Sequence, residues 1–96
     1  MMDLKDFAKL IQQAYVNLGL KSPTQIKELW ESFHVLSRKV SLAEFKILLK
    51  QLHDSDFRQY EMDRGSSRFP ENRKYGIMSD KGLLCYFRYN PKETIN

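Results

Sequence analysis

The sequence is poor in cysteine, proline and glycine, with one, three and four of them in 96 residues. The single cysteine, Cys85, excludes an internal disulfide framework and is typical of a reducing cytosol. No apolar run approaches the roughly 20 residues that span a bilayer, so we expect no membrane helix. Acidic residues at the start of the chain argue against a signal peptide, and a cytoplasmic protein is therefore expected.

The side chains that catalysis or metal binding needs are also sparse. His34 and His53 fall on different expected helices, and with one cysteine there is no metal-finger spacing. Partial burial as a structural residue is the favoured interpretation of His53, and a place in the core that of Cys85. No nucleophile–base–acid set can be nominated. We expect no metal, no cofactor and no enzymatic activity.

What the chain does have is an ordinary globular composition with a moderate basic excess. Hydrophobic residues make up 42% and charged residues 29%, and the length suits one domain. We expect a single domain over 1–96, with its core in 3–90 and a frayed tail over 91–96. The net charge is +4, and residues 21–53 hold six cations against three carboxylates. Many unrelated proteins share such a charge, so its distribution matters more than its sum.

The first helix is expected over residues 3–18, where apolar residues recur at three- and four-residue spacing. Gly19 has the position of a left-handed residue that ends a helix, with Leu20 placed to pack back onto it. A second helix is predicted to begin at Ser22 as its N-cap. Pro23 then takes the first helical position.

The third helix, residues 41–54, combines a clear start with a polar outer face. Ser41 and Glu44 form a capping-box spacing, and Val40 supplies the apolar residue before the cap. One side of the expected helix is apolar and packs inward. The opposite side includes Lys46, Ile47, Lys50 and Gln51.

A change of periodicity after the third helix predicts a small antiparallel sheet. Alternation over 57–62 indicates a partly exposed strand, and turn-forming residues over 63–74 indicate a basic loop. Residues 74–78 form a short expected strand, followed by a turn over 79–82. The strongest strand signal is 83–89, which is apolar on nearly both faces. The fold class expected is α+β, a three-helix core followed by a β-ribbon.

This order of elements resembles the winged helix-turn-helix class over about residues 4–89. The resemblance rests on the spacing of Phe45, Leu49, Leu52 and Phe57, and on the run 73–82, which is similar to a strand that ends a wing. It implies that the third helix reads the major groove of double-stranded DNA while the wing grips phosphates. A small transcriptional regulator is the function that it implies.

Two sets of residues are the candidate DNA contacts under this interpretation. The first lies on or just before the third helix and consists of Arg38, Lys39, Ser41, Lys46, Ile47, Lys50 and Gln51; the second lies in the basic loop and consists of Arg64, Arg68, Arg73 and Lys74. Lysine and glutamine can bond base edges, isoleucine can touch a thymine methyl, and arginine can hold phosphates. The alternative interpretation of the same residues is a solvated polar face.

A protein-interaction module is the competing hypothesis. The strand 83–89 has Leu84, Tyr86 and Arg88 on one side, and a domain of this size comfortably covers one of the strand's two faces. Tyrosine and arginine are enriched at protein interfaces. The same strand at a sheet edge can also pair with its copy in a homodimer, unless the first helix folds back over it.

Overall fold

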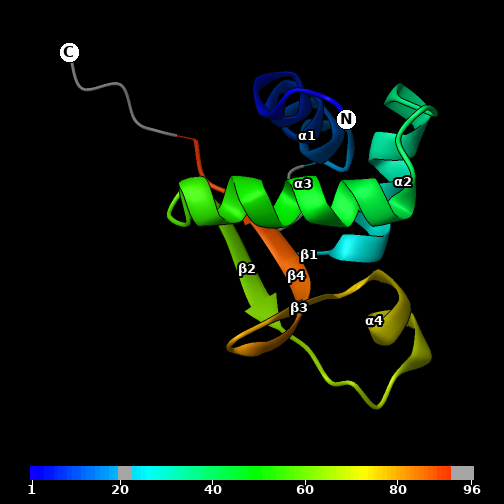
Figure 1. Ribbon diagram of the computed structural model, residues 1–96, viewed down its shortest axis with the longest axis vertical. Coiled ribbons are helices and arrows are strands. Elements are labelled where there is room, and N and C mark those ends of the chain that lie inside the picture. Colours follow the sequence, from blue (N-terminus) through cyan, green and yellow to red (C-terminus); the bar gives the residue numbers. More distant parts are fainter. Residues whose placement is uncertain (20–22, 92–96) are drawn as a thin grey trace.

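The computed structural model describes residues 1–19 and 23–91, which contain four helices and four strands. In chain order these are α1 (Leu4–Asn17), β1 (Thr24–Gln25), α2 (Ile26–Leu36), α3 (Leu42–Ser55), β2 (Tyr60–Arg64), α4 (Pro70–Tyr75), β3 (Ile77–Ser79) and β4 (Gly82–Tyr89). Helices α1, α2 and α3 gather at one end of the molecule, and the sheet runs from them toward α4 at the other (Figure 1). The α+β class predicted from the sequence is confirmed.

Aromatic side chains join the first three helices. Phe7 of α1, Phe33 of α2 and Phe45 of α3 are all fully buried, and their ring centroids lie 5.1–5.8 Å apart. Each buried phenylalanine stabilises the fold by about 1.5–3 kcal/mol, and its tilted ring contacts add about 0.5–1.5 kcal/mol. This cluster fixes the position of α3 relative to the rest of the molecule.

The residue predicted to end α1 and the residue predicted to cap the start of α3 both have the expected geometry. Gly19 has a φ of 77°, the left-handed conformation that favours glycine after a helix. The Oγ of Ser41 accepts the Glu44 N–H at 3.1 Å, and Val40 is buried. The Glu44 carboxylate accepts from the Met2 nitrogen at 3.3 Å, which ties the start of the chain to α3. The predicted packing of Leu20 lies outside the described residues.

The predicted start of the second helix is wrong. α2 begins at Ile26, because Thr24 and Gln25 instead pair with Phe87 and Tyr86 of β4 as strand β1. Thr24 is fully buried, and its hydroxyl donates to Glu28 at 3.2 Å. The expected cap, Ser22, lies outside the described residues. Pairing with a strand at the far end of the chain outweighs the local helix signals.

The sheet is antiparallel and centred on β4. β2 pairs with one edge of β4 in the register Tyr60↔Tyr89 and Met62↔Phe87, while β1 and β3 share the other edge. The strand predicted over 57–62 begins at Tyr60, because the preceding residues turn back onto Asp56. Pairing of β4 with its copy across a free edge is therefore wrong, since neighbouring strands occupy both of its edges.

The basic loop predicted over 63–74 is only partly a loop. Its first residues belong to β2, and Pro70–Tyr75 form α4, with Pro70 in the first turn where its missing N–H costs nothing. The strand predicted over 74–78 accordingly begins only at Ile77. Side-chain contacts hold this short helix in place: Lys27 of α2 pairs with Glu71 at 2.9 Å, and Asn72 donates to the Ser66 carbonyl at 2.8 Å. The tail predicted to fray lies, beyond residue 91, outside the described residues.

Candidate nucleic-acid interface

The outer face of α3 is accessible. Ile47 is 48% exposed and Gln51 is exposed, while Lys46 and Lys50 are half-buried beside them. The Lys46 ammonium donates to the Lys74 carbonyl at the end of α4, at 3.0 Å. The Lys50 ammonium pairs with Asp54 one helical turn away, at 2.9 Å. Two of the predicted contact lysines are thus already oriented by neighbours, and one of them shares its charge with a carboxylate.

The face of α3 that carries these residues borders a hollow of about 590 Å³, which we call the basic groove. α3 supplies Lys46, Ile47, Lys50, Gln51 and Asp54, and the opposite wall consists of Arg73, Gly76, Ile77, Met78 and Leu83. Three cations face one carboxylate in this lining. The structure therefore brings together five of the residues singled out in the sequence, four on α3 and Arg73 on α4.

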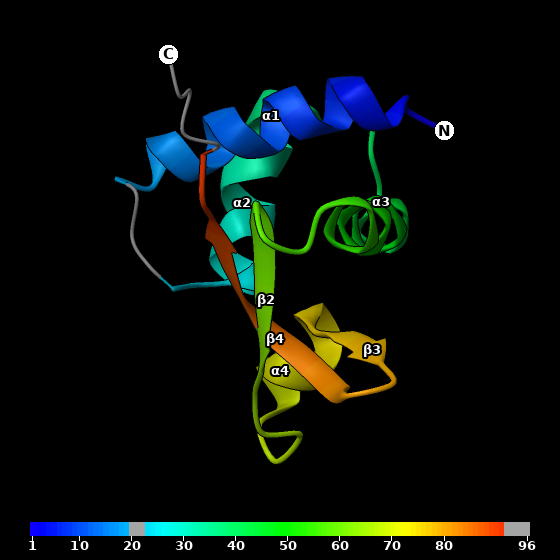
Figure 2. The same cartoon turned by 90° about the vertical axis from the view of Figure 1, so that its left-hand side faces the viewer.

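α3 and the hairpin of β3 and β4 project on the same side of the molecule. Figure 2 shows α3 end-on with β3 below it, both on the right-hand side of that view. The basic groove separates the two. A helix and a hairpin on one side can contact a single extended partner together.

The remaining predicted cations do not line the groove. Arg38 and Lys39 are exposed in the turn before α3. Arg64 donates to the Lys81 carbonyl at 3.3 Å and so lies against the tip of the β3–β4 hairpin. Arg68 is exposed in the connection between β2 and α4.

The two cations of α4, Arg73 and Lys74, are each held by a local contact. One Arg73 nitrogen donates to the Ser67 carbonyl at 2.6 Å, which fixes the guanidinium against the preceding connection. The Lys74 ammonium lies 5.1 Å from the centre of the Tyr75 ring, a cation–π arrangement. The positions of both side chains are thereby restricted.

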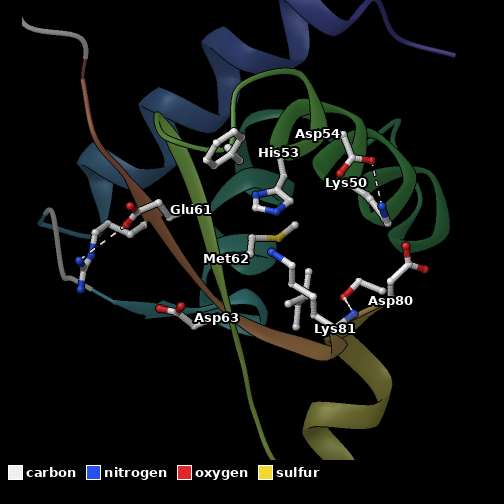
Figure 3. Close-up of a pocket in the computed structure, with 12 residues that line it drawn as sticks. Lys50, His53, Asp54, Glu61, Met62, Asp63, Asp80 and Lys81 are labelled. Carbon is white, nitrogen blue, oxygen red and sulfur yellow. Dashed lines mark hydrogen bonds and ion pairs between the residues drawn. The ribbon is translucent and has the colours of Figure 1, made fainter.

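A second hollow, which we call the mixed-charge cleft, lies between the end of α3, β2 and the β3–β4 turn. Its volume is about 550 Å³, and it shares Lys50 and Asp54 with the basic groove. His53 points into it above Met62 and Lys81 (Figure 3). Its carboxylates outnumber its cations by four to three; the carboxylates are Asp54, Glu61, Asp63 and Asp80, and the cations are Lys50, Lys81 and Arg88.

His53 has a structural contact in this cleft. Its Nδ1 lies 2.6 Å from the Tyr60 carbonyl oxygen, and since a carbonyl can only accept, Nδ1 carries the proton. The half-buried imidazole thus ties the end of α3 to the first residue of β2. Among residues 1–19 and 23–91, no group of three His, Cys, Asp or Glu side chains is arranged to hold a metal ion.

The residues proposed for a protein interface differ in exposure. Leu84 is 5% exposed and belongs to the hydrophobic core, so the prediction that it lies on a spare face is wrong. Tyr86 and Arg88 are half-exposed, and Arg88 pairs with Glu61 of β2 at 3.7 Å. Cys85 is buried, and that burial raises the pKa of its thiol above the usual range. These features make Cys85 a core residue, as expected from the sequence.

The sequence did not reveal the apolar residues of the basic groove. Met78 is 71% exposed and Leu83 is half-buried, and both line the groove opposite α3. Strand periodicity alone gives no indication of which element a strand residue faces across a hollow. The exposed Ile47 on an otherwise polar helix face was the one local signal of an apolar site there.

Comparison of the chain with protein-family models, curated proteins and solved structures finds no match. In the part of the chain that the structure describes, no helix has the length and apolar content that a bilayer span requires.

Proposed function

We propose that the chain is a small DNA-binding protein that acts as a transcriptional regulator. In this proposal α3 enters the major groove, while α4 and the neighbouring connection grip the phosphate backbone. The observation that carries the proposal is the placement of cations from α3 and α4 on the two walls of one groove, beside a projecting hairpin. A major groove about 12 Å wide admits one helix.

Each contact follows from the chemistry of its side chain. The exposed Gln51 amide suits an adenine edge, Lys50 suits guanine or a phosphate, and Ile47 suits a thymine methyl. The exposed Arg38 and Lys39 precede the N-terminus of α3, where helix N–H groups favour a phosphate.

The hydroxyl of Ser41 contributes differently from a free side chain. Its oxygen already accepts the Glu44 N–H, so only its O–H proton is left to donate to a phosphate. Arg73 and Lys74 would contact the backbone from a helix rather than from a loop, with Arg64 and Arg68 at the periphery. A homodimer in a cytoplasmic setting completes the proposal, because two-fold proteins read two-fold sites.

The proposal is tested by fluorescence anisotropy with a labelled random-sequence duplex at about 50 and 200 mM salt. With six to eight phosphate contacts, affinity should fall by roughly three orders of magnitude or more between the two salts. Absence of binding at the lower salt would contradict DNA binding. A single-stranded oligonucleotide of the same length serves as the comparison, and tighter binding of it would contradict duplex reading.

A protein-interaction role is the second candidate, and a specific observation favours it. Ile47 and Met78, 48% and 71% exposed, lie in the same groove. Strand 83–89 retains Tyr86 and Arg88 as half-exposed contacts for such a role. The role of Tyr86 in protein binding is tested with Tyr86→Ala. This variant should bind a protein partner more weakly than the native protein does, while its affinity for duplex DNA stays unchanged.

A further inference from the structure

Three apolar side chains from the two walls of the basic groove, Ile47, Met78 and Leu83, form what we call its apolar floor. Ile47 on α3 and Met78 on β3 are 48% and 71% exposed, and Leu83 of β4 is half-buried. Apolar side chains scattered singly over a surface need no explanation, whereas these three line one hollow beside three cations. The floor therefore has a property that phosphate binding does not use.

Positive charge borders this floor on both sides. Lys46 and Lys50 belong to the α3 wall, and Arg73 belongs to the α4 wall. Asp54 is the one carboxylate in the lining that the structure describes, and it is already paired with Lys50. Lys46 is held toward the opposite wall by its bond to the Lys74 carbonyl. A complementary ligand is therefore apolar along its middle and acidic along both flanks.

We infer that the basic groove binds an acidic amphipathic helix of a partner protein. Such a helix presents apolar side chains at i, i+3, i+4 and i+7 as one stripe, with charged residues on both flanks. Its stripe covers Ile47, Met78 and Leu83, and its carboxylates meet Lys46 and Arg73. The groove volume of about 590 Å³ accommodates the apolar anchors while the helix backbone stays outside.

A nucleic-acid strand fits the same groove less well. Bases bind single-strand sites mainly by stacking on aromatic side chains, and the described lining contains none. The inference goes beyond DNA binding and does not depend on it, because Met78 and Leu83 have no part in the duplex contacts proposed above. Since Lys46, Lys50 and Arg73 belong to both sites, helix and duplex would compete.

The experiment is a binding titration with a labelled synthetic peptide. The probe is a helix of about 20 residues, long enough to be helical in water, with leucines in one stripe and glutamates on both flanks. Anisotropy should give a Kd on the order of 10 μM. A peptide with lysine in place of every glutamate should bind at least about tenfold more weakly, because the groove repels it.

Two variants with equal exposure locate the site. Met78→Glu places a carboxylate on the groove floor, while Val35→Glu makes the same kind of change on α2 outside the groove; both native side chains are 71% exposed. Met78→Glu should raise the Kd of the acidic peptide about tenfold or more, and Val35→Glu less than about twofold. Because both positions are at the surface, both variants should fold.

Two results would overturn the inference. The first is equal binding of the glutamate and lysine peptides, and the second is an equal effect of Met78→Glu and Val35→Glu on the Kd of the acidic peptide. Failure of duplex binding in the native protein contradicts only the DNA proposal.

Discussion

The basic groove and the mixed-charge cleft are two hollows of similar size, about 590 and 550 Å³, that share Lys50 and Asp54. Their linings differ: cations exceed carboxylates by three to one in the groove, while carboxylates exceed cations by four to three in the cleft. A polyanion is attracted to the first and repelled from the second. The two sides of α3 therefore differ in net charge, and the DNA proposal predicts that a duplex binds on the groove side alone.

The largest expected loss of stability comes from truncating Phe45, which packs α3 against α2. The Phe45 ring is fully buried and lies 5.1 Å from both Trp30 and Phe33. Phe45→Ala should lower the free energy of unfolding by about 3–5 kcal/mol, measured by urea denaturation. Phe57→Ala is the control: its side chain is 62% exposed, and the change should be within about 0.5 kcal/mol. Equal costs would contradict the packing account.

A smaller loss of stability is expected from a substitution at Gly76, which lines the basic groove but not the mixed-charge cleft. A Cβ at Gly76 would collide with the Asn72 carbonyl oxygen and lie 2.9 Å from the Leu83 side chain. Gly76→Ala should therefore shift α4 relative to β4 and destabilise the fold by about 1–3 kcal/mol. Thermal unfolding checks the cost, with the exposed Ser67→Ala as a neutral comparison. A Gly76→Ala variant as stable as the native protein would mean that this wall is not tightly packed.

The charge comparison itself is tested by two matched lysine variants. Lys46 lines the groove and Lys81 lines the cleft. Lys46→Ala should weaken duplex binding about three- to tenfold and reduce the salt dependence by about one contact, whereas Lys81→Ala should leave both nearly unchanged. Anisotropy titrations at several salt concentrations measure both quantities. A larger loss of duplex affinity in Lys81→Ala than in Lys46→Ala would indicate that the nucleic acid binds at the mixed-charge cleft, which contradicts the proposal.

The smallest effect concerns Asp54, one of the two residues that line both hollows. Asp54→Asn removes the carboxylate that pairs with Lys50 at 2.9 Å, and so raises the positive charge of the groove. Duplex affinity should rise about twofold, and stability should change by less than about 1 kcal/mol because the pair is exposed. Asp80→Asn, in the cleft alone, is the control. A fall in affinity for Asp54→Asn would show that Asp54 orients Lys50 productively.

The helical core could be read from the sequence because its signals are local. The apolar spacing predicted one buried face on each of α1 and α3, and Phe7, Ile11, Phe45 and Leu49 are indeed buried there. The Ser41 cap was equally predictable, since one side chain bonds an N–H three residues later. Periodicity and capping depend on neighbours within one or two turns.

The sheet and α4 were less predictable because they depend on distant partners. Thr24 joins β4 through Phe87, and no local pattern reveals a partner so far along the chain. Pro70 was interpreted as a loop former, although its position at the start of α4 is one that proline favours. The same holds for the basic groove. The sequence predicted the polar outer face of α3, but it did not predict that Met78 and Leu83 lie opposite that face.

The most direct test of the central claim is amide chemical-shift mapping of the protein during titration with duplex DNA. The account predicts that shifts concentrate at residues 38–51 and 73–78, on α3 and the facing wall of the basic groove, while residues 57–63 beside the mixed-charge cleft stay unchanged. Shifts centred on the cleft or around Tyr86, with the groove silent, would contradict it.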